Sequence, residues 1–185
     1  MLNIAQEIIG FLIHAFLQYS SKCRSRYLER RYRKSGLNIK TNGPGRISGL
    51  EGLQIGENVH IGEGYHIDAR GKVSIGDNVH ISRNVVIYST SHNFDGERVP
   101  YDSGLRKKSV VIGDNVWLGM NVIVLPGAEI GEGAIVGAGA VVAGEVAPCS
   151  INVAIKAKEI KFRDKDIYQK NIMSNRFGGA NGEEL

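Results

Sequence analysis

The sequence predicts an all-β solenoid, in which short parallel strands and sharp turns wind around a triangular prism. The main observation is an aliphatic residue at every sixth position, a period that belongs neither to a β-strand nor to an α-helix. The later series is Ile112, Leu118, Val124, Ile130, Val136 and Val142. The earlier series, with a shift of two residues at 68–72, is Ile55, Ile61, Ile67, Ile75, Ile81 and Ile87. Three such units would close one coil of about 18 residues, as in a hexapeptide β-helix.

Two further features of the repeat support this fold. A small or β-branched residue comes four positions after the aliphatic residue, and a glycine often follows it directly. The glycines are Gly56, Gly62, Gly76, Gly113, Gly119, Gly131 and Gly137. We expect the aliphatic side chains to stack inside the prism about 4.8 Å apart. We expect the glycines to adopt turn dihedrals that a β-carbon would crowd.

An amphipathic, basic helical segment, residues 1–35, is predicted to precede the prism. Its apolar run at 8–17 is shorter than the about 20 residues that span a bilayer, and it lacks the features of a secretory signal. Seven cations and one anion give 22–34 a charge of +6, whereas the whole chain carries +4. Since the remainder is acidic, we expect no nucleic-acid binding. Two interpretations stay open: the helix packs on the prism or a partner subunit, or it lies on anionic lipid.

The rest of the chain divides into a β-helix and a tail. Residues 36–163 are expected to form the β-helical catalytic domain, with 147–149 closing the repeat, and residues 164–185 a polar C-terminal tail. Cys23 and Cys149 lie in unlike segments. We therefore expect no disulfide framework and a reduced, cytoplasmic protein.

The repeat is interrupted between Ile87 and Ile112, which are 25 residues apart. The polar segment between them breaks the six-residue pattern. A solenoid tolerates an insertion on one face, and such loops often carry function. We therefore expect an excursion loop here and look for the chemistry in it.

Three stretches of the sequence resemble the hexapeptide-repeat acyltransferases, in the branch of galactoside, maltose, nodulation-factor and surface-polysaccharide O-acetyltransferases. They are Ser-His-Asn-Phe-Asp at 91–95, Ile-Gly-Asp-Asn-Val-Trp-Leu-Gly at 112–119 and Ile-Val-Gly-Ala-Gly-Ala-Val-Val at 135–142. The resemblance extends over about residues 39–163. It implies a left-handed parallel β-helix, acetyl-CoA as co-substrate, no metal, and a homotrimer with active sites between subunits.

The resemblance also implies roles for individual residues. His92 would be the general base, and the chemistry agrees, because a neutral imidazole can take a proton from a sugar hydroxyl that attacks a thioester. Asn93 and Asp95 are candidate acceptor-binding residues. Galactoside and maltose enzymes place acceptor-binding Asn and Asp where this chain has Gly62 and Arg70, which argues against a free mono- or disaccharide. The acetyl-CoA-binding positions correspond to Trp117, Gly119, Met120, Ala138, Ala143, Gly144, Lys158, Lys161 and Arg163.

A metal site is not predicted. His60 and His80 occupy the same position on successive coils, and Trp117 and Ile135 continue that column. The γ-class carbonic anhydrases resemble this family in fold and bind zinc with three histidines. This chain has no His-x₄-His pair, and His92 falls outside the column, so the histidine column is interpreted as structural.

The sequence thus predicts an acetyl-CoA-dependent O-acetyltransferase that acts on a carbohydrate hydroxyl, in a surface polysaccharide or its precursor. The enzyme would be cytoplasmic or peripheral at the inner face of the plasma membrane. Alternatives are N-acetylation of an amino-sugar nucleotide and O-acetylation of an antibiotic. An alternative of another class is a non-catalytic β-helix scaffold.

Overall fold

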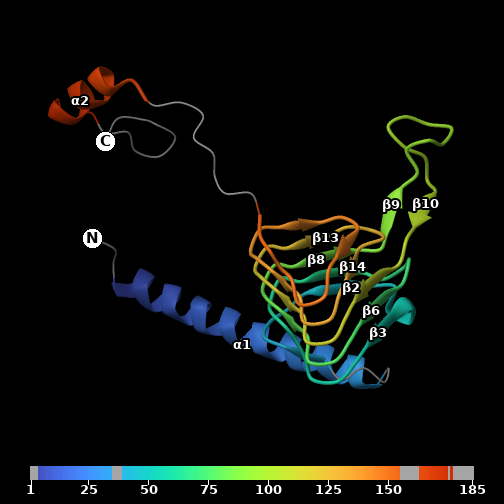
Figure 1. Ribbon diagram of the computed structural model, residues 1–185. Coiled ribbons are helices and arrows are strands. Elements are labelled where there is room, and N and C mark those ends of the chain that lie inside the picture. Colours follow the sequence, from blue (N-terminus) through green and yellow to red (C-terminus); the bar gives the residue numbers. More distant parts are fainter. Residues whose placement is uncertain (1–3, 35–38, 155–162, 175, 177–185) are drawn as a thin grey trace. The chain divides into compact units, whose positions relative to one another are not determined.

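The computed structural model describes residues 4–34, 39–154, 163–174 and 176 of the 185-residue chain. The chain divides into two compact units, Met1–Ala154 and Ile155–Leu185. The first unit contains helix α1 (Ile4–Lys34) and the β-helix, and the second contains helix α2 (Lys165–Met173). Figure 1 shows the stacked coils of the β-helix in the first unit.

Three parallel sheets form the walls of the prism, and each coil contributes one strand to each sheet. Sheet A contains β1 (Ile39–Thr41), β4 (Val59–Ile61), β7 (His80–Ile81), β12 (Trp117–Leu118), β15 (Ile135–Val136) and β18 (Ile151–Asn152). Sheet B contains β2 (Arg46–Ser48), β5 (His66–Asp68), β8 (Val86–Tyr88), β13 (Ile123–Val124) and β16 (Val141–Val142). Sheet C contains β3 (Leu53–Ile55), β6 (Val73–Ile75), β11 (Val110–Ile112), β14 (Glu129–Ile130) and β17 (Glu145–Val146). The predicted β-helix is confirmed.

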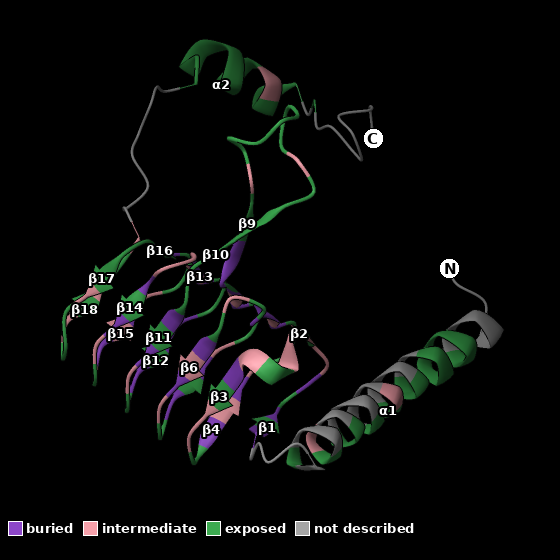
Figure 2. Cartoon of the chain, turned by 90° about the vertical axis from the view of Figure 1, so that its right-hand side faces the viewer, coloured by how far each residue is buried: buried purple, intermediate pink, exposed green. Residues whose placement is uncertain are grey.

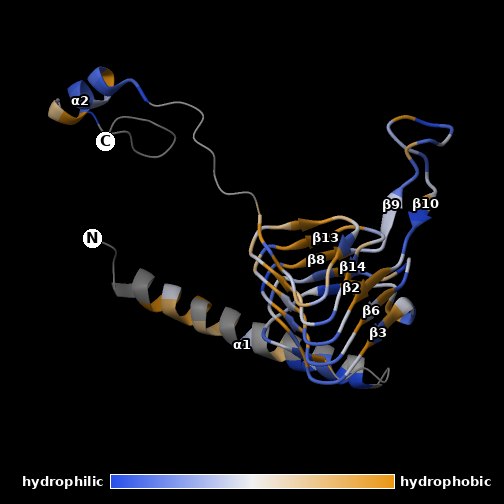
Figure 3. Ribbon diagram, viewed as in Figure 1, coloured by the Kyte–Doolittle hydropathy of each residue, from blue (hydrophilic) through white to orange (hydrophobic). Residues whose placement is uncertain are grey.

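The core is the column of aliphatic side chains inside the prism, seen as buried segments on the strands in Figure 2 and as apolar bands in Figure 3. Eleven of the twelve predicted aliphatic residues are buried, and Ile55 is partly buried and packs against them. The register Ile61–Ile81–Leu118 shows the stacking directly. Because one hexad buries little apolar surface alone, the coils stabilise one another by stacking.

The glycines that follow the aliphatic residues have a different role from the predicted one. None of the seven has a positive φ. A β-carbon on Gly119 would lie 2.7 Å from the backbone nitrogen of Ala138, and one on Gly62 would lie 2.4 Å from that of Arg83. Both neighbours belong to the next coil, so these glycines allow close stacking. Left-handed backbone occurs two positions after these glycines, at Asn58, Asn78, Asn115 and Asn121 and at Gly64, Gly133 and Gly139.

The three edges of the prism differ in their regularity. Turns from sheet A to sheet B and from sheet C to sheet A keep the six-residue spacing in every coil. Turns from sheet B to sheet C, here called the B–C edge, do not. Their spacings are eight residues for Ile47–Ile55, eight for Ile67–Ile75, 25 for Ile87–Ile112, six for Val124–Ile130 and four for Val142–Val146.

The predicted excursion loop leaves the prism at the B–C edge as a hairpin (Figure 1). Its antiparallel strands are β9 (Thr90–His92) and β10 (Leu105–Lys107), with His92 opposite Leu105. In the first coil the same edge carries the 3₁₀ turn η1 (Leu50–Gly52). Every departure from the hexapeptide repeat within the prism therefore falls on one edge.

Helix α1 contacts β1 near its C-terminal end, where the backbone N–H of Thr41 donates to Glu29 Oε1 at 2.7 Å. Seven large apolar side chains of its first half that the structure describes do not pack on the prism of the same chain, because each is more than half exposed. They are Ile8, Ile9, Phe11, Leu12, Ile13, Phe16 and Tyr19. None of the helices that the structure describes is both long and apolar enough to cross a membrane.

The C-terminal region differs from the prediction at two points. The repeat does not close at 147–149, because β18 follows and pairs with β15. Part of the predicted polar tail is helical, since Asp164 caps α2 by accepting a hydrogen bond from the Ile167 N–H at 2.9 Å. Residues 175 and 177–185 of the predicted tail lie outside the described residues.

Candidate active site

A pocket of about 380 Å³ lies at the B–C edge, where the excursion loop leaves the prism. Its volume is within the range of small-molecule sites. The pocket is lined by Asp68, Arg70, Tyr88, Thr90, Ser91, His92 and Leu105. The candidate base His92 thus shares a concave surface with residues from two successive coils.

The imidazole of His92 is held by stacking. Its ring lies 3.9 Å from the ring of Tyr101, centroid to centroid, with an interplanar angle of 16°. Among the described residues, no hydrogen bond reaches either of its ring nitrogens. The stacking therefore fixes the plane of the ring and leaves both nitrogens available to a substrate, as a general base requires.

The two predicted acceptor-binding residues have partners inside the loop. The Asn93 side chain donates to Asp102 Oδ2 at 2.9 Å and accepts from Arg106 Nε at 3.1 Å. Asp95 forms an ion pair with Arg106 at 2.5 Å, and the same guanidinium lies 4.1 Å above the ring of Phe94. These contacts shape the loop behind His92, and an acceptor-binding role for Asn93 and Asp95 stays a prediction.

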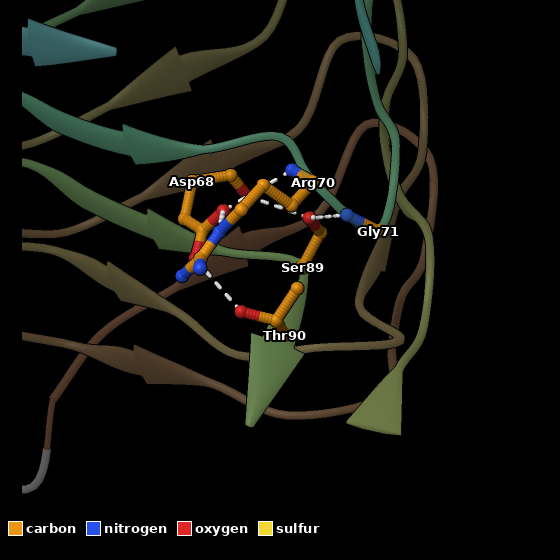
Figure 4. Close-up of polar contacts among 5 residues, drawn as sticks. All are labelled: Asp68, Arg70, Gly71, Ser89 and Thr90. Carbon is orange, nitrogen blue, oxygen red and sulfur yellow. Dashed lines mark hydrogen bonds and ion pairs between the residues drawn. The ribbon is translucent and has the colours of Figure 1, made fainter. Parts of the chain in front are cut away.

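The carboxylate of Asp68 is the best-satisfied polar group in the pocket (Figure 4). Its Oδ1 accepts hydrogen bonds from the backbone N–H and the Nε of Arg70, at 3.1 and 2.9 Å. Its Oδ2 accepts from Arg70 Nη2 at 2.6 Å and from Thr90 Oγ1 at 2.7 Å. The Arg70 side chain, with the help of Thr90, holds the pKa of this carboxyl well below its usual range, against the opposite effect of burial.

Ser89 joins the two coils below this carboxylate. Its hydroxyl donates to the carbonyl oxygen of Asp68 at 2.6 Å and accepts from the Gly71 N–H at 2.8 Å. Asp68, Arg70 and Gly71 belong to one coil, and Ser89 belongs to the next (Figure 4). Sequence reasoning missed Asp68, although the two-residue shift at 68–72 marked the place.

Tyr88, Thr90 and Leu105 were also missed as pocket residues. Tyr88 pairs with Asp68 in the cross-strand register, and its ring lies 5.6 Å from that of His66. The sequence did contain a signal for these residues, namely the positions of the two interruptions of the repeat relative to each other. The shift after Ile67 and the insertion after Ile87 lie one coil apart, so both had to fall on the same edge.

The predicted acetyl-CoA-binding residues occupy two different edges of one chain. Gly119, Met120 and Ala138 lie in the turns from sheet A to sheet B, where Arg83 Nε contacts Met120 Sδ at 3.2 Å. Ala143 and Gly144 follow β16 at the B–C edge, which is the edge of His92. A single chain therefore does not bring all of these residues together.

The other residues predicted to bind acetyl-CoA lie elsewhere in the structure. Trp117 is half exposed, and its Nε1–H donates to Ser82 Oγ at 3.3 Å. Arg163 is exposed in the second unit, and Lys158 and Lys161 lie outside the described residues. The binding roles of all these positions stay predictions.

The histidine column on sheet A has the predicted register. His60 pairs with His80, whose next neighbour is Trp117, followed by Ile135. The His60 and His80 rings stack with centroids 6.4 Å apart. In the part of the chain that the structure describes, no group of three or more His, Cys, Asp or Glu side chains could hold a metal ion.

Comparisons with known proteins point to one family. Residues 109–144 match the family described as bacterial transferase hexapeptide (six repeats), and residues 73–89 match the hexapeptide repeat of succinyl-transferase. The chain is 34% identical over 128 residues to the dTDP-4-amino-4,6-dideoxy-D-glucose acyltransferase of Escherichia coli, covering 66% of this chain and 67% of that protein. It is 33% identical to the galactoside O-acetyltransferase of Escherichia coli K12, covering 63% and 61%.

A solved structure of a hexapeptide-repeat acetyltransferase from Vibrio cholerae, complexed with acetyl-CoA, has a TM-score of 0.57 and 28% identity. The match covers 64% of this chain and 63% of that one. The chain belongs to the hexapeptide-repeat transferase family, as the resemblance predicted. It spans between 54% and 67% of the length of the first curated relatives that it matches.

Proposed function

We propose that this protein is an acetyl-CoA-dependent O-acetyltransferase that acetylates a carbohydrate hydroxyl, in a surface polysaccharide or its precursor. The observation that carries the proposal is the position of His92, stacked on Tyr101 and facing a pocket at the irregular edge of a hexapeptide β-helix. Three findings support it: the family membership, the relative named galactoside O-acetyltransferase, and the similar structure that was solved with acetyl-CoA.

In the proposed reaction, neutral His92 takes the proton of the acceptor hydroxyl as that oxygen attacks the thioester carbonyl. A C–O bond forms, the C–S bond breaks, and the imidazolium returns its proton to the departing thiolate. A positioned base of this kind contributes about 10²- to 10⁴-fold. Holding both substrates side by side contributes much of the remaining acceleration. The stacking on Tyr101 keeps the imidazole in one plane throughout.

We propose a homotrimer with its active sites between neighbouring subunits. Met120 and Ala138 lie in turns from sheet A to sheet B, here called the A–B edge, whereas His92 lies at the B–C edge. If both edges contribute to one site, the A–B edge of one copy must face the B–C edge of another. A closed cyclic assembly satisfies that requirement at every interface. Sedimentation analysis tests it, since a monomer that is fully active would contradict the proposal.

The test of the reaction measures release of free thiol from acetyl-CoA with a panel of sugars, sugar nucleotides and capsule fragments. The comparison is between wild type, His92→Gln and the control His60→Gln, whose histidine lies on sheet A away from the pocket. We expect acceptor-stimulated release to fall at least ~100-fold in His92→Gln and to persist in the control. Equal turnover of wild type and His92→Gln would refute the assignment of the base. If wild type and both variants bind acetyl-CoA but none of them turns over with any acceptor, the protein is better explained as a non-catalytic scaffold.

N-acetylation is the second candidate, because one relative is named for an amino-sugar nucleotide. The same base and pocket would serve an amine. Treating the product with hydroxylamine distinguishes the two, since an ester releases its acetyl group and an amide retains it. We expect release.

We also propose that α1 contacts the anionic inner face of the plasma membrane. The seven large apolar side chains between Ile8 and Tyr19 that the structure describes as exposed spread over an arc of about 200° at 100° per residue. The basic residues Arg26, Arg30 and Arg33 that follow are also exposed. The apolar residues lie in the first half of the helix and the basic residues in the second, so apolar burial and attraction to anionic lipid can both contribute to binding. Flotation with anionic liposomes at low and high salt tests it, and a protein that never floats contradicts it.

A further inference from the structure

We infer that the acceptor carries an anionic group, a carboxylate or a phosphate ester, and that Arg70 binds this group and thereby determines specificity. The inference rests on the proposed function, because it places the acceptor in the pocket that contains His92. Arg70 and His92 both line this pocket.

The guanidinium of Arg70 is fixed on one side and free on the other. Its Nε and one hydrogen of Nη2 bind the carboxylate of Asp68. Its Nη1 has no partner among the described residues, and its side chain is 47% exposed, whereas that of Asp68 is 4% exposed. The outer edge of the guanidinium therefore presents unused N–H donors to the pocket.

The fold does not require this ion pair. In the cross-strand register, the position of Asp68 is occupied by Ser48 on the preceding coil and by Tyr88 on the following one. A buried carboxylate paired with an arginine stabilises a fold no better than apolar packing of similar volume, so the reason for this pair lies elsewhere. Here the reason is orientation: a two-point contact with Asp68, itself held by Thr90, removes the rotational freedom of the guanidinium.

An oriented guanidinium edge matches the geometry of a carboxylate or a phosphate, which can accept two parallel N–H bonds. The rest of the pocket is compatible with an anion. Asp68 is the single acidic side chain among the pocket residues, and its charge is balanced by Arg70. A sugar anchored there by its anionic group would present its hydroxyls within the pocket that His92 lines.

The test uses three matched oligosaccharide acceptors whose terminal sugar is glucose, glucuronic acid or glucose 6-phosphate, so that they differ at one carbon. Thiol release from acetyl-CoA is measured with wild type, Arg70→Gln and Arg70→Lys. We expect wild type to prefer an anionic acceptor over glucose at least ~10-fold in kcat/KM, and the better one identifies the anion. Arg70→Gln should lose ~10- to 100-fold with the anion, mainly through KM, and less with glucose, so that the preference for the anion is lost. Arg70→Lys keeps the positive charge but loses the two-point contact of the guanidinium, so its kcat/KM with the anion should lie between those of wild type and Arg70→Gln.

Since Arg70→Gln leaves the buried Asp68 unpaired, the double variant Asp68→Asn/Arg70→Gln serves as a second test and should show the same loss of anion preference. Equilibrium binding of the three acceptors to His92→Gln separates this inference from the proposed reaction. Anions that bind no tighter than glucose, in binding and in turnover, overturn the inference and leave the role of His92 intact. The opposite outcome is also distinguishable. If anion binding depends on Arg70 but turnover does not depend on His92, only the proposed general base is overturned.

Discussion

Two edges of the same prism use polar side chains in opposite ways. At the edge from sheet C to sheet A, six-residue turns place Asn58, Asn78 and Asn115 above one another. Their side-chain amides form a ladder, with contacts of 3.0 and 3.3 Å, that continues at 3.5 Å to Glu132. At the B–C edge, the turns differ in length, and a buried carboxylate orients an exposed guanidinium next to a histidine. The first edge joins coils, whereas the second forms a pocket.

The difference follows from the geometry of a solenoid. Where successive coils have equal length, each turn covers the next, and its polar groups can bind each other in a repeating pattern. Where they differ, one turn leaves part of its neighbour uncovered. At the B–C edge the spacing changes from eight to 25 to six residues within three coils. A concave site is therefore expected on this edge, and the pocket that His92 lines lies there.

Shortening the excursion loop should change the B–C edge most strongly. His92 and Leu105 face each other in the antiparallel ladder, so an Asn-Gly turn can replace residues 93–104 between them. The removed segment, which is exposed apart from two partly buried residues, includes Tyr101. We expect turnover to fall ~100-fold because the imidazole loses its stacking partner, and the melting temperature to stay within a few degrees. A large loss of stability would mean that the loop belongs to the core of the fold.

A core substitution should have the opposite effect. Leu118 is fully buried in sheet A, on the regular part of the prism, between Ile81 and Val136. Leu118→Ala should lower the free energy of unfolding by about 2–5 kcal/mol, through lost apolar contacts and the cavity that remains. Urea denaturation at fixed protein concentration measures this. The surviving folded enzyme should keep the acceptor preference of wild type, since the pocket lies at another edge.

The carboxylate of Asp68 should make the B–C edge sensitive to acid. The Arg70 side chain lowers the pKa of Asp68 in the folded state below its unfolded value of about 3.9. A depressed carboxyl pKa stabilises the fold above the unfolded pKa, and this contribution is lost as the pH falls below it. Asp68→Asn should therefore be less stable than wild type by about 1–3 kcal/mol at neutral pH, and the difference should shrink below about pH 4. A difference that does not depend on pH would contradict the proposed ionic state.

Sequence periodicity predicted the prism well because its core obeys one rule. A side chain at every sixth position must point inward, and residues such as Ile81 and Leu118 show this without knowledge of distant contacts. The histidine column followed from the same counting. The glycine assignment was wrong because the reason for Gly119 lies in the neighbouring coil, at Ala138, and not in its own turn.

The site was predicted less completely. His92 was found because it lies in the insertion and in a recognisable motif. Asp68 and Tyr88 were missed because an acid or an aromatic residue after an aliphatic one has no distinctive local pattern. Their role depends on the edge of the prism at which they lie together. That position is determined by the lengths of all the preceding turns. Sequence also cannot show that α2 forms after Arg163, since its cap at Asp164 is a common residue in loops as well.

The regular edge offers the finest test, because its asparagines have two separable roles. Asn78 has a φ of 57°, and its side chain joins Asn58 to Asn115. Asn78→Gly removes the side chain and keeps the left-handed backbone accessible, whereas Asn78→Ala removes the side chain and strains the backbone. We expect the glycine variant to lose less than about 1 kcal/mol and the alanine variant about 1 kcal/mol more, with turnover unchanged in both. Equal losses would assign the stability of this edge to the amide ladder, and a loss of turnover would show that the two edges are coupled.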